Sequence, residues 1–170
     1  TTQKIISVNL NQVLLVDYLY TRNIIPDEAT ALVETENSLA QAISSDDVRF
    51  ILIRAVNHHL LRGVRVNTAF NVCSMQEMNP AVIAGYFDDL RNCDSEGVYF
   101  YCCNREETVL PDGTVTKFGE YPWNDSDEII VDGLCPWNQT FYLFRPPFFQ
   151  RYNGPVRHRL VKFNNTDVGN

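Results

Sequence analysis

The sequence predicts an α+β protein in which N-terminal helices pack against a mainly antiparallel sheet formed largely by the C-terminal half. Residues 1–92 carry apolar side chains at helical spacing, whereas residues 93–170 carry short alternating runs that Gly and Pro interrupt. The 170 residues, 45% of them hydrophobic, suffice for one hydrophobic core. We therefore expect a single domain over residues 1–170, with a helix-rich part (1–92) and a β-rich part (93–170).

The segment over residues 4–11 alternates between apolar and polar side chains, which is the period of a half-buried strand. Ile6, Val8 and Leu10 share its apolar face. A terminal strand of this kind either pairs within its own sheet or adds to the edge of a neighbouring subunit, so these three residues are interface candidates. Residues 12–22 are densely apolar and form either a short helix, which the sequence favours, or a continuation of the buried strand.

Two longer helices are expected next. Pro26, followed by two carboxylates, favours the start of a helix over residues 26–43. Ser45 is a suitable N-cap for a helix over residues 48–61, where apolar side chains recur at helical spacing before a glycine. Because its apolar face is wide, we expect this second helix to lie deep in the core.

The remaining elements are shorter. Residues 64–72 alternate as a strand with one polar face, and Asn79-Pro80 begins a short helix that ends near Leu90. The strands expected in the β-rich part span residues 98–103, 114–118, 128–131, 140–144 and 156–163. The first two should form a β-hairpin, because the loop between them contains the turn sequence Pro111-Asp112-Gly113.

The net charge of -7 disfavours binding to nucleic acid, whose affinity rests on basic side chains that neutralise phosphates. The charge is unevenly spread. Residues 141–170 contain five basic residues and one acidic residue, so this segment carries +4 and the remainder -11. A protein polarised in this way could associate head to tail. We expect no membrane span and no signal peptide, because no apolar run is long enough and no cleavage site is present.

The cysteines indicate an oxidising compartment. None of them forms the C-x-x-C pair of a zinc site or a thioredoxin-like centre, so disulfides are favoured over reduced, buried thiols. An odd number leaves one thiol for a partner chain or a buried site. The five disulfide candidates are Cys73, Cys93, Cys102, Cys103 and Cys135. Fifteen patterns of two bridges are open, and Cys102 and Cys103 should point to opposite faces of one strand.

Three sequons are present, with Asn124, Asn138 and Asn164 as glycosylation candidates. One or two matches would arise by chance, so the sequons alone are weak. Together with the cysteines they favour a secreted or extracellular protein.

Motifs that carry chemistry are few. Adjacent His58 and His59 point about 100° apart on a helix, so they do not form a paired metal motif. No nucleophile elbow and no glycine-rich phosphate loop is present. We therefore expect no catalytic residue, no metal site and no cofactor.

An acidic loop over residues 125–132 is the most suggestive of the paired-carboxylate segments. Its oxygen ligands suit a cation, and Trp123 and Trp137 on either side could frame a sugar. Because the loop lacks the spacing of an EF-hand, the sequence favours a solvated loop over either site.

Residues 141–152 interleave aromatic side chains with arginine, a composition typical of protein interfaces. The interface candidates in this segment are Tyr142, Phe144, Arg145, Phe148, Phe149, Arg151 and Tyr152. The sequence favours a buried strand followed by a Pro-fixed turn over an interface.

These observations lead to one functional expectation and two alternatives. We expect a secreted or surface-exposed, glycosylated structural or interaction protein that binds other protein chains or self-assembles as a homo-oligomer, filament or particle subunit. In the assembly version, residues 4–10 would lie on a neighbouring subunit. The alternatives are a small secreted hydrolase, with the acidic loop and His58 or His158 as acid and base, and an apolar-ligand carrier with an aromatic-lined cavity.

Overall fold

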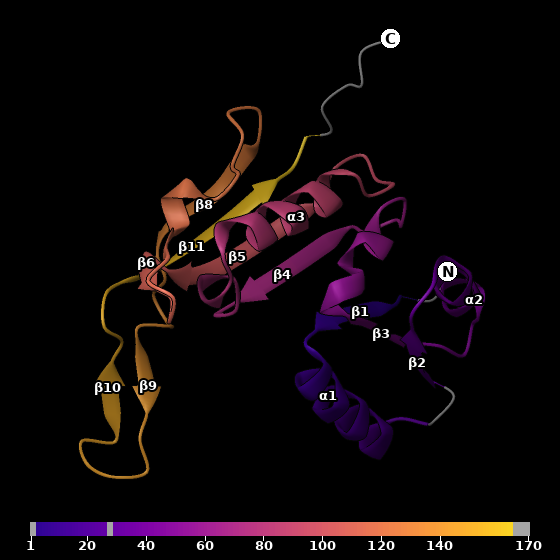
Figure 1. Ribbon diagram of the computed structural model, residues 1–170, viewed down its shortest axis with the longest axis horizontal. Helices are drawn as coiled ribbons and strands as arrows, with labels where there is room; N and C mark the ends of the chain where they lie inside the picture. Colours follow the sequence, from indigo (N-terminus) through magenta and orange to yellow (C-terminus); the bar gives the residue numbers. More distant parts are fainter. Residues whose placement is uncertain (1–2, 27–28, 165–170) are drawn as a thin grey trace. The chain divides into compact units, whose positions relative to one another are not determined.

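The computed structural model describes residues 3–26 and 29–164 and confirms the α+β class (Figure 1). The contacts divide the chain into two compact units, Thr1–Leu61 and Arg62–Asn170. Whether the whole chain behaves as the single domain expected from its length stays a prediction. In the described part of the chain, no helix has the length and apolarity that crossing a bilayer requires.

The first unit is a three-stranded parallel sheet with two helices. Its elements are β1 (Ile5–Asn9), α1 (Asn11–Ile24), β2 (Thr30–Val33), α2 (Glu36–Ser44), β3 (Phe50–Arg54) and the 3-10 helix η2 (Ala55–Leu61). The strand order is β1-β3-β2, with β3 in the centre. The strand expected over 4–11 and the helix expected over 12–22 are both present, as β1 and α1.

The deep helix expected over residues 48–61 is wrong, because the segment forms β3 and then η2. Ile51, Leu52 and Ile53 are all at most 1% exposed. A central parallel strand is covered on both faces and is therefore apolar at consecutive positions. Such a run fits helical spacing as well as it fits a buried strand, so periodicity alone does not distinguish them.

The helix expected over residues 26–43 is also wrong in its first half. Residues 30–33 form β2, and helix α2 begins only at Glu36. Thr35 caps this helix: its hydroxyl accepts from the Ser38 N–H, while the Ser38 hydroxyl accepts from the Thr35 N–H. This local cap starts the helix later than Pro26 suggests. The two acidic residues that follow Pro26, at positions 27 and 28, lie outside the described residues.

Strand β1 pairs with β3 inside its own sheet, in the parallel register that places Ile5 beside Phe50. The expectation that residues 4–10 lie on a neighbouring subunit is therefore wrong, and with it the version of assembly that rests on this strand. Ile6 and Val8 are half-buried in this sheet, and Leu10 is exposed just before α1. The sheet accounts for Ile6 and Val8, whereas Leu10 as an interface candidate stays a prediction.

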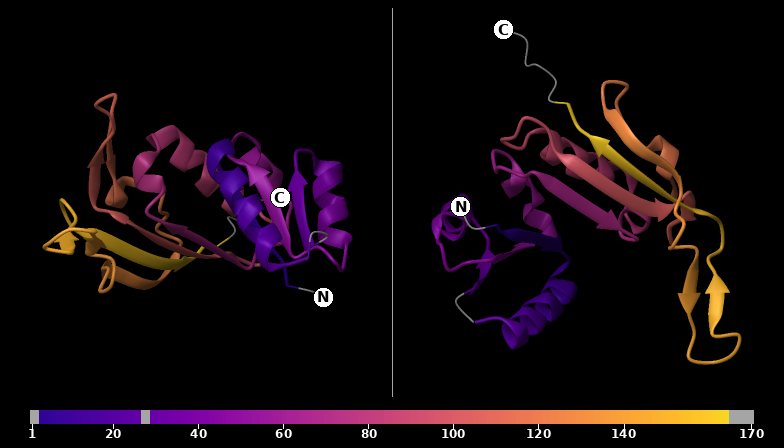
Figure 2. Two further views of the ribbon diagram at one scale, coloured as in Figure 1. Left: turned by 90° about the horizontal axis from the view of Figure 1, so that it is seen from below. Right: turned by 180° about the vertical axis from the view of Figure 1, so that it is seen from behind.

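The second unit contains a four-stranded sheet of order β4-β5-β11-β8, in which β4 and β5 are parallel and the other neighbours antiparallel (Figure 2). Its elements are β4 (Thr68–Val72), η3 (Met75–Glu77), α3 (Pro80–Arg91), β5 (Tyr99–Arg105), β6 (Glu107–Val109), β7 (Val115–Lys117), η4 (Phe118–Glu120), β8 (Glu128–Leu134), β9 (Thr140–Tyr142), β10 (Phe149–Arg151) and β11 (Val156–Lys162). Helix α3 begins as expected, with the Asn79 side chain accepting from the Val82 N–H and with Pro80 in the first turn.

The hairpin expected between residues 98–103 and 114–118 pairs differently. The turn at Pro111-Asp112-Gly113 joins β7 to the short strand β6, whereas β5 pairs with β4 and β11. The turn signal is correct, but a tight turn selects the strand nearest in sequence, and that strand is the short β6.

The expected strand over residues 64–72 forms only at 68–72, and its faces are reversed. Phe70 and Val72 are exposed, whereas Ala69 and Asn71 are half-buried. The Asn71 side chain accepts from the Met75 N–H and from the Asn104 amide, so it is satisfied on the covered side of the sheet.

An aromatic cluster forms the main core of the second unit, where α3 covers one face of the sheet. Phe87 of α3 packs edge-to-face on Phe100 at 5.5 Å and on Trp123 at 4.9 Å, measured between ring centroids. Phe163, which follows β11, lies 5.6 Å from Phe87. These rings come from segments far apart in the chain, so the core joins α3 to β5 and β11.

Candidate protein-binding surface

Strands β9 and β10 form a hairpin that projects beyond the four-stranded sheet (Figures 1 and 2). Tyr142 lies opposite Phe149 in the antiparallel register. The loop between the strands is closed by the Phe148 N–H, which donates to the Arg145 carbonyl oxygen at 3.0 Å. We call residues 140–151 the aromatic hairpin.

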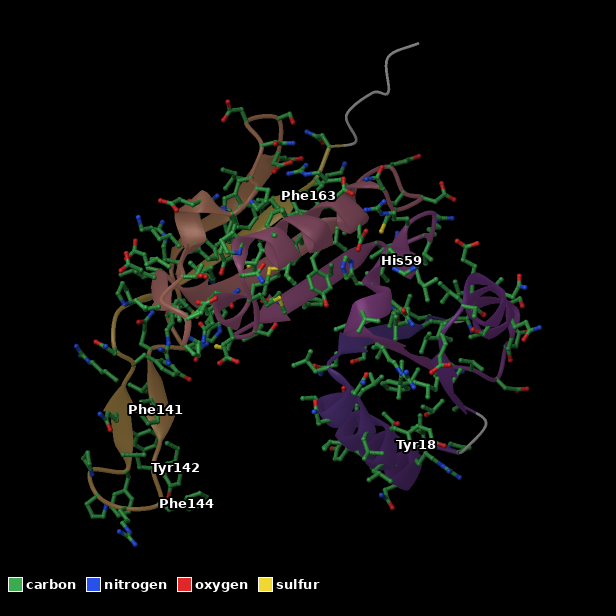
Figure 3. The ribbon with its side chains drawn as sticks, viewed as in Figure 1. Tyr18, His59, Phe141, Tyr142, Phe144 and Phe163 are labelled. Carbon is green, nitrogen blue, oxygen red and sulfur yellow. The ribbon has the colours of Figure 1, made fainter. Side chains whose placement is uncertain are left out.

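The tip of the aromatic hairpin exposes aromatic rings to solvent (Figure 3). Phe144 is 93% exposed, Phe149 66% and Tyr142 57%. Tyr142 contacts both other rings edge-to-face, with centroids 5.7 Å from Phe144 and 5.5 Å from Phe149. The expectation that this segment is a buried strand is wrong, because each of these three residues is more than half exposed.

The other side of the hairpin anchors it to the sheet. Phe141 packs on Tyr152 at 5.3 Å, and the Arg105 guanidinium lies 5.3 Å from the Tyr152 ring centroid. The Gln139 amide donates to the Cys135 and Val156 carbonyl oxygens at 2.7 and 2.8 Å. Tyr152 is half-buried and supports the hairpin. Among the interface candidates in this segment, Tyr152 therefore has a structural role.

Two exposed arginines, Arg145 and Arg151, flank the aromatic rings. Neither has an ion-pair partner among the described residues. Phe148 is 45% exposed in the loop between them, with a left-handed backbone at φ 65°. The hairpin therefore presents apolar surface bordered by unpaired positive charge.

The carboxylates of the acidic loop do not converge. Asp127 is buried and accepts two hydrogen bonds at 2.8 Å from Arg91. Asp132 accepts from Arg159 at 2.6 Å and from Arg157 at 3.2 Å. Glu128 is exposed. Over residues 3–26 and 29–164, no group of three or more His, Cys, Asp or Glu side chains is arranged to hold a metal ion.

The tryptophans and the histidine of the second unit do not complete a sugar or hydrolytic site at this loop. Trp123 packs in the core and donates to the Phe118 carbonyl oxygen at 2.9 Å. Trp137 lies against His158, with ring centroids 5.4 Å apart, and His158 Nδ1 is 3.2 Å from the Tyr101 hydroxyl. The acidic loop and His158 therefore do not form the acid–base site of the hydrolase alternative, and the version with His58 stays a prediction.

His58 and His59 lie in η2 of the first unit, with ring centroids 6.5 Å apart and planes at 72°. The α-helix on which they were expected to point about 100° apart is not formed, and the two rings contact each other edge-to-face.

Two cavities bear on the carrier alternative. One of about 310 Å³ is lined by Ile25, Pro26, Ala29, Asp46, Asp47 and Arg49. The other, of about 100 Å³, is lined by residues of α3, β7 and η4 with Tyr121 as its one aromatic side chain. Neither is the aromatic-lined cavity that an apolar-ligand carrier would need.

All five cysteines are thiols rather than disulfides. Cys102 packs in the aromatic core with Cys93, and Cys103 packs in a second cluster with Cys135, so the two neighbours do lie on opposite faces of β5. Cys73, which follows β4, shares the amide of Asn138 with Cys103. No spacing in the sequence indicates which cysteines meet.

The three sequon asparagines differ in their surroundings. Asn124 is exposed at the start of the acidic loop. Asn164 is exposed, and its amide donates to the Ser126 carbonyl oxygen. The Asn138 amide points into the protein and donates to Cys73 Sγ at 3.0 Å. Asn124 is therefore the best placed of the three to carry a glycan.

Comparison with known proteins finds no family model and no curated sequence that matches this chain.

Proposed function

We propose that this chain is an extracellular, glycosylated interaction protein that self-assembles through its aromatic hairpin. The observation that carries the proposal is the exposure of Phe144, Phe149 and Tyr142 together at the hairpin tip. Aromatic side chains combined with arginine are the residue types that contribute most to binding at protein interfaces. The three rings already contact one another in the hairpin, which lowers the loss of conformational entropy on binding.

The charge of the chain supports a second copy as the partner. The aromatic hairpin carries +2 and the remainder of the chain carries -9, so the hairpin of one copy complements the rest of another. Such a contact joins two different surfaces and is heterologous. A heterologous contact builds a ring or an open filament according to whether its rotation closes.

Sedimentation of the full chain over a range of concentrations tests this proposal. We expect concentration-dependent association that weakens with added salt. Phe144→Ala should weaken it about 30-fold, the factor that corresponds to one interface hot spot of about 2 kcal/mol. Arg145→Glu should weaken it as well and reduce its dependence on salt.

Phe70→Ala is the matched control, because Phe70 is 73% exposed on β4 and lies outside the hairpin. It should associate like the wild type. A chain that stays monomeric at every concentration, or association that Phe144→Ala leaves unchanged, would overturn the proposal.

The extracellular part of the proposal is tested by the intact mass of the natural protein. We expect a mass raised by glycan units, which Asn124→Gln lowers by one glycan. An unmodified mass would discard the extracellular assignment and leave the self-assembly test unaffected.

A further inference from the structure

Three thiols converge on Asn138 at the end of the four-stranded sheet nearest the hairpin. The Asn138 amide nitrogen donates to Cys73 Sγ at 3.0 Å and lies 3.8 Å from Cys103 Sγ. The Asn138 backbone N–H donates to Cys135 Sγ at 3.3 Å. A single residue therefore holds together cysteines from three segments that are far apart in the chain.

Within this thiol cluster, Cys103 and Cys135 are the two buried members, and they pack together with Val156. Both residues are at most 1% exposed. Cys73 is half-buried, so it alone of the three reaches solvent. Its N–H donates to the Cys103 carbonyl oxygen at 2.9 Å, which fixes it next to the pair.

The other two cysteines lie elsewhere. Cys102 is on the opposite face of β5, in the aromatic core, and Cys93 belongs to that same core. A disulfide requires converging side chains, whereas Cys93 and Cys102 pack in the core on the other face of β5 from Cys103 and Cys135.

We propose that Cys103 and Cys135 form an intrachain disulfide when the protein meets a disulfide oxidant such as oxidised glutathione, and that Cys73 is the thiol that receives the oxidant. This inference is independent of the proposed function. Its consequence is that the segment 135–139, which leads into the aromatic hairpin, becomes covalently tied to β5.

The chemistry balances as three exchanges. The Cys73 thiolate attacks oxidised glutathione, forms a mixed disulfide and releases one glutathione thiol. Cys103 then attacks the Cys73 sulfur and releases the second glutathione. Finally Cys135 attacks the Cys103 sulfur and returns Cys73 to a thiol. Two thiols lose two protons and two electrons, and oxidised glutathione gains them as two glutathione molecules.

The order of these steps follows from burial. Desolvation raises the pKa of Cys103 to about 11, so this thiol is protonated at neutral pH and shielded from a solvent-borne oxidant. Once Cys73 carries the mixed disulfide, the attack on it is intramolecular, and proximity compensates for the small thiolate fraction of Cys103.

The test oxidises the reduced full chain with oxidised glutathione, traps the remaining thiols with N-ethylmaleimide and maps the linked peptides by mass. We expect three labelled thiols and one linked peptide pair that contains Cys103 and Cys135. The Cys93→Ser variant should give the same pair. In the wild-type chain, five labelled thiols, or a final pair that includes Cys93 or Cys102, would overturn the proposal.

The role of Cys73 has its own readout, which is the rate of disulfide formation. Cys73→Ser should form the same final pair at least about tenfold more slowly, because the remaining thiols are buried. In the Cys135→Ser variant, oxidation should end at a disulfide between Cys73 and Cys103. A Cys73→Ser variant that oxidises at the wild-type rate would rule Cys73 out as the receiving thiol.

Discussion

At the scale of single residues, the ion pair between Arg91 and Asp127 connects α3 to the acidic loop. The Asp127 side chain is 1% exposed and that of Arg91 is 15% exposed. The carboxylate also accepts from the Asn124 N–H at 2.9 Å, so both of its oxygens are satisfied. Burying a charge is tolerated only with partners of this kind, and the loss of one partner leaves the other charge uncompensated.

Replacing this carboxylate should destabilise the second unit. We expect Asp127→Asn to lower the free energy of unfolding by about 3 kcal/mol, because Arg91 would remain buried without a counter-charge. Chemical denaturation followed by tryptophan fluorescence measures this, since Trp123 packs in the adjacent core. The control is Glu128→Gln, an exposed carboxylate at the start of β8, which should change stability by less than about 0.5 kcal/mol. Equal effects of the two variants would contradict the assignment.

Asp132 should make stability depend on pH in the acid range. Burial alone would raise the pKa of its carboxyl, but hydrogen bonds from Arg159 and Arg157 outweigh burial and lower it. A carboxyl with a lowered pKa contributes stability above its unfolded pKa of about 4, and that contribution is lost as the pH falls through the folded pKa. The difference in unfolding free energy between wild type and Asp132→Asn should therefore be constant above about pH 5 and shrink below about pH 4. A difference that stays the same down to about pH 3 would be inconsistent with this.

At the scale of elements, the caps and turns explain where helices begin. Helix α2 starts at Glu36 because Thr35 and Ser38 satisfy each other's N–H groups, in a capping box that uses serine in place of the usual glutamate. The apolar residues before Glu36 have the spacing of a continuation of this helix, yet residues 30–33 form β2 and pair with β3. The element boundary is thus set by a hydroxyl and not by Pro26.

The Thr35 cap makes a testable contribution. Thr35→Ala should lower the free energy of unfolding of the first unit by about 1 kcal/mol, the usual effect of removing an N-cap hydroxyl. Asn37→Ala is the control, because Asn37 is exposed one position into the helix and alanine favours helices. Urea denaturation followed by far-ultraviolet circular dichroism measures both. If the two variants were equally stable, the cap would not be what starts the helix.

At the scale of the whole molecule, the contacts favour two cores over one. The central strand β3 is buried within Thr1–Leu61, while the aromatic cluster lies within Arg62–Asn170. Both tryptophans, Trp123 and Trp137, belong to the second unit, so tryptophan fluorescence reports on that unit and circular dichroism reports on both.

This difference between probes tests the number of cooperative units. We expect Leu52→Ala to remove about 3 kcal/mol from the first unit, because Leu52 is 1% exposed in the central strand. The circular-dichroism transition should then begin earlier, and the midpoint of the tryptophan fluorescence should not move. A shift of both midpoints together would instead support the single domain over residues 1–170 that the sequence predicts.

Features that depend on neighbours within a few residues could be predicted from the sequence alone. The α+β class, the start of α3 at Asn79-Pro80 and the turn at Pro111-Asp112-Gly113 follow from local dihedral preferences and local hydrogen bonds. These signals do not require knowledge of what packs from elsewhere in the chain.

Which segments are covered, and which of them meet, depends instead on tertiary packing. Residues 50–54 are a strand because β1 and β2 supply hydrogen bonds on both sides, although their apolar run also fits a helix. The ring of Phe144 is exposed because no described segment returns over the hairpin tip. Cys73, Cys103 and Cys135 meet at Asn138 because β4, β5 and β8 belong to one sheet. Burial and long-range proximity are properties of the packed chain, and no local pattern encodes them.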